Sequence, residues 1–206
     1  MTHIEHSEKV LVMKVFLTVL ILVFNLQSWS KANDVKDFEI EGITVGESLL
    51  DYYSEKEIKK KINEETSIWY PKNAYVSILV KSKNFKTYEE LGIVLDATNN
   101  KYIIEGIEGT FNYKDDIDEC YKKQDIITSD LKDMFLNNVE FQSFKSKYQA
   151  DKSGKSLVKY NDFYFKNGGA IRVICYDMNK DFMDPNDQLY LAINSKKFLD
   201  WLNENM

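Results

Sequence analysis

Alternating hydrophobic and polar residues mark several segments of the chain as β-strands. The alternating segments lie at 38–41, 74–81, 92–96, 102–107, 157–166, 170–176 and 189–193. A period of two is typical of a strand that buries one face. The turn residues Thr98-Asn99-Asn100 and Asn167-Gly168-Gly169 separate neighbouring strands, and Asn-Gly suits turns that need a positive φ. The pattern therefore predicts strands joined as antiparallel hairpins.

Hydrophobic residues at helical spacing appear in three other places. The clearest set predicts a helix that begins after Asp115 or Asp116 and fades near 137–138, and it consists of Ile117, Cys120, Gln124, Ile127, Leu131 and Met134. Ser54 and Glu57 form a capping-box pattern, and Ser195 precedes the apolar residues of a terminal helix. Residues 142–156 are polar, and we expect a loop there. The order of these elements predicts an α+β fold, with a mainly antiparallel sheet of about six or seven strands and two to three helices packed on it.

Residues 13–32 have the layout of a secretory signal peptide. Met13 and Lys14 give a positive start, an apolar run follows at 15–26, and small residues precede a cleavage point between Ala32 and Asn33. The run is shorter than the roughly 20 apolar residues of a transmembrane helix, so we expect no such helix in the mature chain. The expected organisation is an N-terminal extension plus a cleavable signal peptide at 1–32, and a single soluble α+β domain at 33–206. We interpret 1–12 as sequence upstream of the true start, with a real extension of the signal as the alternative.

The charge of the chain argues against two classes of partner. The sequence has 27 basic and 33 acidic residues, and its predicted mature part carries a net charge of −7. Nucleic acid and anionic membranes require clustered positive charge, so neither is an expected partner. Both histidines, His3 and His6, lie in the predicted leader. The mature chain would therefore lack histidine as a base or metal ligand, and we assign no catalytic residue.

Cys120 and Cys175 are the only cysteines. Cys120 lies on the apolar stripe of the predicted helix, and Cys175 shares a predicted strand face with Ile171 and Val173. A helix on that face would bring the two sulfur atoms together, and paired cysteines in exported domains are usually bonded. We therefore predict a Cys120–Cys175 disulfide, with two buried free thiols as the alternative.

The segment from Asp177 resembles the beginning of a calcium-binding loop. Asp177, Asn179 and Asp181 match the first three side-chain ligands of such a loop. Phe182 replaces the expected glycine, and Gln188 replaces the closing glutamate. Calcium is therefore a candidate cofactor at these three residues, and a solvated loop is the alternative.

Two further features suggest a binding face. Arg172, the only arginine, is either an anion clamp or an exposed or ion-paired residue of the sheet. The abundant tyrosines either line a binding face or pack as ordinary strand residues. They include Tyr52, Tyr53, Tyr70, Tyr75, Tyr160, Tyr164 and Tyr176.

Five short segments resemble a group of uncharacterised exported proteins from small-genome marine alphaproteobacteria. They are FEIEGI at 38–43, SLLDYYS at 48–54, CYKK at 120–123, ADKSG at 150–154 and FLDWL at 198–202. The resemblance implies a periplasmic location, and it assigns no activity and no functional residue.

Together these features favour a non-enzymatic binding or envelope-accessory module with an unknown protein or small-molecule partner. An Asp/Glu-dependent periplasmic hydrolase, assisted by calcium, is one alternative. A partner-binding or inhibitor module that uses an edge or face of the sheet is another.

The leader and the disulfide make one joint prediction for the exported protein. Its N-terminal residue should be Asn33, and its intact mass should be two hydrogens lower than that of the reduced mature chain. N-terminal sequencing and mass spectrometry measure both quantities. Two reactive thiols in the unfolded, unreduced protein would contradict the disulfide.

Overall fold

A computed structural model describes residues 34–206, except 89 and 136–138. The predicted leader, including the cleavage point between Ala32 and Asn33, lies outside these residues. The segment Ala32–Met206 forms one compact unit. Within the described residues, the helices fall short of the length and apolarity that crossing a membrane requires.

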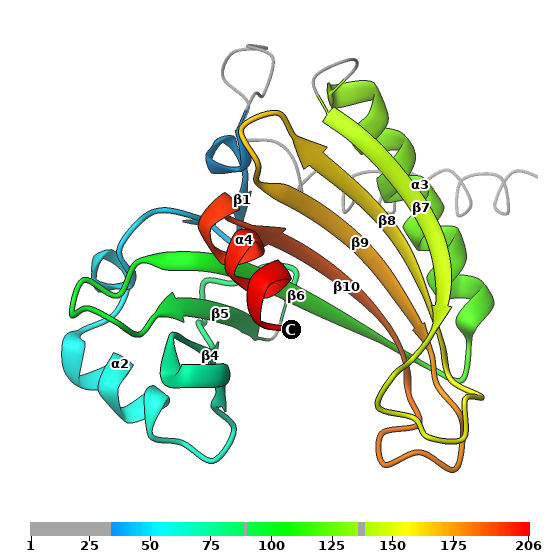
Figure 1. The fold of residues 1–206 in the computed structure, drawn as a ribbon, viewed down its shortest axis with the longest axis horizontal. Helices are drawn as coiled ribbons and strands as arrows, with labels where there is room; N and C mark the ends of the chain where they lie inside the picture. The colour runs from blue at the N-terminus through cyan, green and yellow to red at the C-terminus, as the bar shows by residue number, and fades with distance from the viewer. Residues whose placement is uncertain (1–33, 89, 136–138) are drawn as a thin grey trace, which may run out of the picture. The chain divides into compact units, whose positions relative to one another are not determined.

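The described part of the chain confirms the α+β class (Figure 1). Three α-helices alternate with groups of strands, and they are α2 (Glu55–Ile62), α3 (Ile117–Phe135) and α4 (Lys196–Asn205). Short 3-10 turns are η1 (Val35–Asp37), η2 (Leu49–Asp51) and η3 (Pro71–Asn73). The strands of the N-terminal hairpin are β1 (Glu39–Ile40) and β2 (Ile43–Thr44). The strands of the main sheet are β3 (Ile68–Trp69), β4 (Tyr75–Val80), β5 (Leu91–Asp96), β6 (Ile104–Lys114), β7 (Val139–Lys147), β8 (Leu157–Phe165), β9 (Ala170–Asp177) and β10 (Asp187–Asn194).

The main sheet has eight strands in the order β3-β4-β5-β6-β10-β9-β8-β7, and every neighbouring pair is antiparallel. This is more than the six or seven strands expected. Strand β7 accounts for part of the difference, because it continues to Lys147 through residues expected to be a loop. Most of its side chains are exposed on both faces. A polar sequence can therefore form this strand at the edge of the sheet without alternating hydrophobic and polar residues along its whole length.

Local sequence signals explain where the helices begin. The Ser54 side chain accepts a hydrogen bond from the Glu57 N–H, and Glu57 accepts one from the Ser54 N–H, which completes the predicted capping box. Asp116 accepts a hydrogen bond from the Glu119 N–H at the start of α3. Ser195 accepts one from the Phe198 N–H at the start of α4.

Helix α3 packs on one face of the sheet, chiefly on β9 and β10. The predicted disulfide is present, and it joins Cys120 of α3 to Cys175 of β9 with 6.1 Å between the Cα atoms. Gln124 of α3 also donates hydrogen bonds to the main-chain oxygens of Lys159 and Val173, at 2.9 and 2.8 Å. These contacts hold α3 across the strands that follow it in sequence (Figure 1).

Helix α4 packs on the opposite face. Its Phe198 is buried against Tyr75 of β4 and Val94 of β5. Strand residues alternate between faces, so Val94 points away from the face that carries its neighbour Ile93. Ile93 pairs in register with Ile107, which in turn pairs with Ile193, along the α3-side row. The two faces are therefore covered by different helices, and α4 covers only the part near β4–β6.

Reducing or removing the disulfide should destabilise the fold. Cys120 and Cys175 are separated by 55 residues, and a closed loop of that length contributes about 4 kcal/mol on the chain-entropy model. We expect the double variant Cys120→Ala/Cys175→Ala to lose a free energy of unfolding of that size in urea or guanidinium titrations. Reductant should produce a similar loss in the original protein and none in the double variant. Equal stability of the oxidised and reduced protein would contradict this account.

Candidate functional site

A cleft of about 320 Å³ opens on the α4-side face of the sheet. Strands β6, β9 and β10 supply its floor, α4 lies at one end, and the loop between β9 and β10 lies at the other. We call it the aromatic cleft, after the lining residues Tyr70, Tyr148, Tyr176, Phe182 and Tyr190, and Glu108 is part of the same lining. Its volume is within the range of small-molecule sites, roughly 300–1,000 Å³.

The strand register puts Glu108 in the middle of the floor. Glu108 of β6 pairs with Gly92 of β5 on one side and with Ala192 of β10 on the other, and Ala192 pairs with Arg172 of β9. The Glu108 side chain extends over Gly92, because a Cβ at position 92 would lie 2.5 Å from its Cγ atom. The small residues beside Glu108 therefore leave room for its carboxylate within the sheet face.

Aromatic rings in mutual contact form one wall of the aromatic cleft. The ring of Tyr176 lies 5.7 Å from that of Tyr148 and 5.0 Å from that of Tyr190, centroid to centroid. Tyr148 also contacts Phe182 at 5.7 Å. All three pairs are edge-to-face, which is a favoured arrangement of aromatic rings. Each ring thus limits the movement of the next, and the wall is largely formed before a ligand arrives.

The Glu108 side chain is only partly exposed to solvent. Burial raises the pKa of its carboxyl group above the ordinary glutamate value. Among the described residues, no hydrogen bond or ion pair joins Glu108 to another side chain. Burial, with the nearby charge of Glu108, raises the pKa of Tyr70 to about 12 and also raises that of Tyr190. Both tyrosine hydroxyls therefore remain protonated at neutral pH.

Arg172 lines the same cleft but has a partner. Its Nε and Nη2 atoms donate to the two carboxylate oxygens of Asp162, at 3.1 and 2.9 Å. Asp162 is fully buried and also accepts a hydrogen bond from the Tyr164 hydroxyl. Of the two interpretations of Arg172, the ion-paired sheet residue is confirmed.

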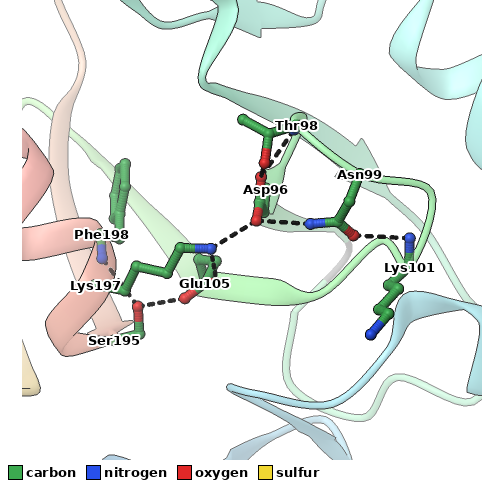
Figure 2. A network of polar contacts seen from close by, with 8 residues as sticks. All are labelled: Asp96, Thr98, Asn99, Lys101, Glu105, Ser195, Lys197 and Phe198. Carbon is green, nitrogen blue, oxygen red and sulfur yellow. Dashed lines mark hydrogen bonds and ion pairs between the residues drawn. The ribbon is translucent and has the colours of Figure 1, made fainter.

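A second polar cluster lies at the beginning of α4 (Figure 2). Lys197 Nζ lies 2.6 Å from Asp96 Oδ2 and 3.1 Å from Glu105 Oε1, and both carboxylates are almost completely buried. The Ser195 hydroxyl donates to Glu105, while Thr98 and Asn99 donate to Asp96. Glu105, Ser195 and Lys197 of this cluster line a hollow of about 370 Å³, together with Lys36 and Lys196.

The two carboxylates of this cluster share the charge of Lys197. Burial alone would lower the pKa of Lys197, but its bonds to Asp96 and Glu105 outweigh burial and raise the pKa to about 12. Burial alone would likewise raise the pKa of Asp96, but Lys197 and Thr98 outweigh it and lower the pKa. A lysine held in its charged form is a poor nucleophile. The cluster therefore anchors α4 to the sheet.

The residues predicted to bind calcium have separate partners. Asp177 lies 3.9 Å from the Lys145 Nζ atom, and Asp181 lies 3.6 Å from the Lys155 Nζ atom. The Asn179 main-chain N–H donates to the Ser156 hydroxyl. In the part of the chain that the structure describes, no three His, Cys, Asp or Glu side chains gather in a way that would hold a metal ion. Calcium binding at Asp177, Asn179 and Asp181 stays a prediction.

The sequence did not single out the central residue of the aromatic cleft. Tyr70 and Tyr176 were among the tyrosines considered, whereas Glu108, Tyr148 and Tyr190 were not. The available signal was a charged residue inside a hydrophobic strand between Gly106 and Gly109. Such a residue must either face solvent or enter a cavity that small neighbours provide.

No protein-family model matches the sequence, and no curated protein matches it significantly.

Replacing the Glu108 carboxylate, which has no side-chain partner among the described residues, should stabilise the protein. A pKa that is higher in the folded state means that folding disfavours the charged form of Glu108, so stability is lost as pH rises through that pKa. We expect Glu108→Gln to increase the free energy of unfolding at pH 7 by roughly 0.5–2 kcal/mol, a typical gain for one stabilising change. The gain should shrink below about pH 4, where an ordinary glutamate is also protonated.

Denaturant titrations at pH 7 and pH 3.5 measure this difference. Asp130→Asn is the matched control for stability, because it removes the same charge from an exposed position on α3 that is outside the first and last turns. A loss of stability in Glu108→Gln at pH 7 would show that the carboxylate has a stabilising partner.

Proposed function

We propose that the protein is an exported periplasmic binding module that holds a small ligand in the aromatic cleft and catalyses no reaction on it. The observation that carries this proposal is the cleft itself, in which packed aromatic rings lie beside a half-buried carboxylate that has no side-chain partner among the described residues. Clefts of this kind, apolar with a few convergent polar groups, are the usual form of a small-molecule site. The rigid wall also favours binding, because little side-chain freedom remains to be lost.

Several observations support export. A bonded cysteine pair persists in oxidising compartments and is rare in the cytosol. The signal-like pattern at 13–32 agrees with this chemistry. The resemblance to exported alphaproteobacterial proteins supports the periplasm as the compartment.

A binding role accounts for the aromatic cleft better than hydrolysis. Carboxylate-dependent hydrolysis of glycosides uses two acids that act together. Asp184 is the second carboxylate of the lining, but it accepts hydrogen bonds from the side-chain amides of Asn186 and Gln188. The Asp/Glu-dependent hydrolase, with or without calcium, remains the alternative that the experiment below tests.

A partner-binding role at the sheet edge has weaker support. In the described part of the chain, β7 pairs only with β8 and leaves its other edge open. Exposed lysines, Lys145 and Lys147, lie along this strand. Lysines on an edge strand oppose the addition of another strand.

Native mass spectrometry tests the proposal directly. The protein is incubated with a bacterial metabolite extract freed of macromolecules by ultrafiltration. We expect a bound small molecule that survives in Tyr53→Ala, outside the cleft, and is lost or weakened about tenfold or more in Tyr190→Ala, because a large aromatic contact is removed. Thermal unfolding of both variants checks that each remains folded.

The remaining outcomes are also informative. Consumption of a component in amounts well above that of the protein would favour the hydrolase. Absence of any bound molecule, together with an unchanged melting temperature in every fraction of the extract, would contradict a small-molecule function.

A further inference from the structure

We infer that the ligand of the aromatic cleft is a small organic cation, an alkylammonium or quaternary ammonium group, with Glu108 as its counter-charge. This inference rests on the proposed function, since it identifies the class of ligand for the same cleft. It depends on the charges of the lining, the nature of its walls and the cost of other ligand classes.

The charged residues of the lining sum to a negative site. They are Glu108, Asp184 and Arg172. The charge of Arg172 is already matched by Asp162, through two hydrogen bonds. The hydrogen bonds to Asp184 come from neutral amides, so its charge is not cancelled. An incoming cation would therefore meet two uncompensated carboxylates, whereas an anion would be repelled by both.

The aromatic wall adds attraction of the same sign. The face of a tyrosine ring carries the negative part of its quadrupole, and a cation within about 6 Å of the ring centre is attracted to it. Tyr176 contacts the rings of both Tyr148 and Tyr190, and all three line the cleft with Glu108, so one bound group can meet several rings. Methyl or methylene groups around a positive nitrogen suit such a site, because they contact the rings without needing hydrogen bonds.

A neutral ligand would leave the charge of Glu108 unpaired. Burial already disfavours the charged form of Glu108, and a neutral molecule over it would remove more water without supplying a partner. Burying an unpaired charge carries a large cost. A cation removes that cost, so its binding is favoured over that of a neutral molecule of the same shape.

The same arrangement makes the affinity depend on pH. The groups that face Glu108 are the hydroxyls of Tyr70, Tyr176 and Tyr190, on the segment before η3, on β9 and on β10. Burial raises the pKa of all three, so they do not titrate in the acidic range. Arg172 is two strands from Glu108, about 10 Å along the sheet, and Asp184 lies at the loop end of the cleft. Affinity should therefore fall as pH drops through the pKa of Glu108.

The test compares a cation with neutral molecules of similar shape. Benzyltrimethylammonium and tetramethylammonium are the cations, and neopentylbenzene and tert-butanol are the neutral counterparts. Binding to the full protein is followed by calorimetry or NMR at low salt, with sodium chloride as the control for ionic strength. We expect saturable binding of the cations, and affinity for the neutral counterparts that is lower by about tenfold or more.

Variants assign the effect to particular residues. Glu108→Gln should weaken cation binding by about tenfold or more and leave the neutral molecules unaffected, while Asp118→Asn should change neither. Tyr176→Phe keeps the ring face and should keep cation binding, whereas Tyr176→Leu should lose part of it. Glu108→Gln is expected to be at least as stable as the original protein, so its loss of binding would not reflect unfolding.

The outcomes separate the two proposals. Equal binding of cations and neutral molecules, or cation binding that Glu108→Gln does not weaken, would overturn the cation while leaving the aromatic cleft as the binding site. Binding of a metabolite that is neutral or anionic would do the same. Failure of the probes and of every metabolite fraction to bind would overturn both the cation and the proposed function.

Discussion

The packing of α3 across the sheet is the contact on which the rest of the structure depends. The chain leaves the middle of the sheet after β6, and it returns there only with β10, after three intervening strands. Helix α3 makes this crossing, and the Cys120–Cys175 bond and the two hydrogen bonds of Gln124 fix it over β8 and β9. The pairing of β6 with β10 joins segments far apart in sequence, and such pairing is entropically costly before it forms. A covalent link between helix and sheet reduces that cost.

This crossing also determines where a ligand site can form. Helix α3 seals one face of the strands β8, β9 and β10, and the buried residues of that face, among them Val173 and Leu189, form a continuous core. On the other face, α4 is short and packs near β4 and β5 through Phe198. Beyond α4, the aromatic residues and Glu108 line this face of β6, β9 and β10. The aromatic cleft is thus the part of the second face that no helix covers within the described chain.

The sequence was sufficient for features that depend on nearby residues or on one face of one element. Strand alternation, the cap at Ser54, the hairpin at Gly168 and the faces of Cys120 and Cys175 are of this kind. Strand β7 was missed because both of its faces are largely exposed and hydrophobic alternation is absent. The floor of the cleft could not be predicted, since it requires the pairing of β6 with β10, which are not consecutive in the chain. Turn geometry fixes the register of strands joined by a hairpin, and no hairpin joins β6 to β10.

Two buried carboxylates of the sheet, Asp162 and Glu105, have charged partners, and Glu108 differs from them in this respect. Asp162 is fully buried and has Arg172 as a bidentate partner. Glu105 is almost as buried, and Lys197 and a serine hydroxyl satisfy its two oxygens. The same sheet thus provides partners for its buried acids, as the cost of an unpaired charge requires. Glu108 lies on the same kind of strand position, between glycine and alanine neighbours, without such a partner among the described residues. We expect this unpaired charge to lower the free energy of unfolding of the ligand-free protein. A bound cation would pair with the charge and recover that free energy.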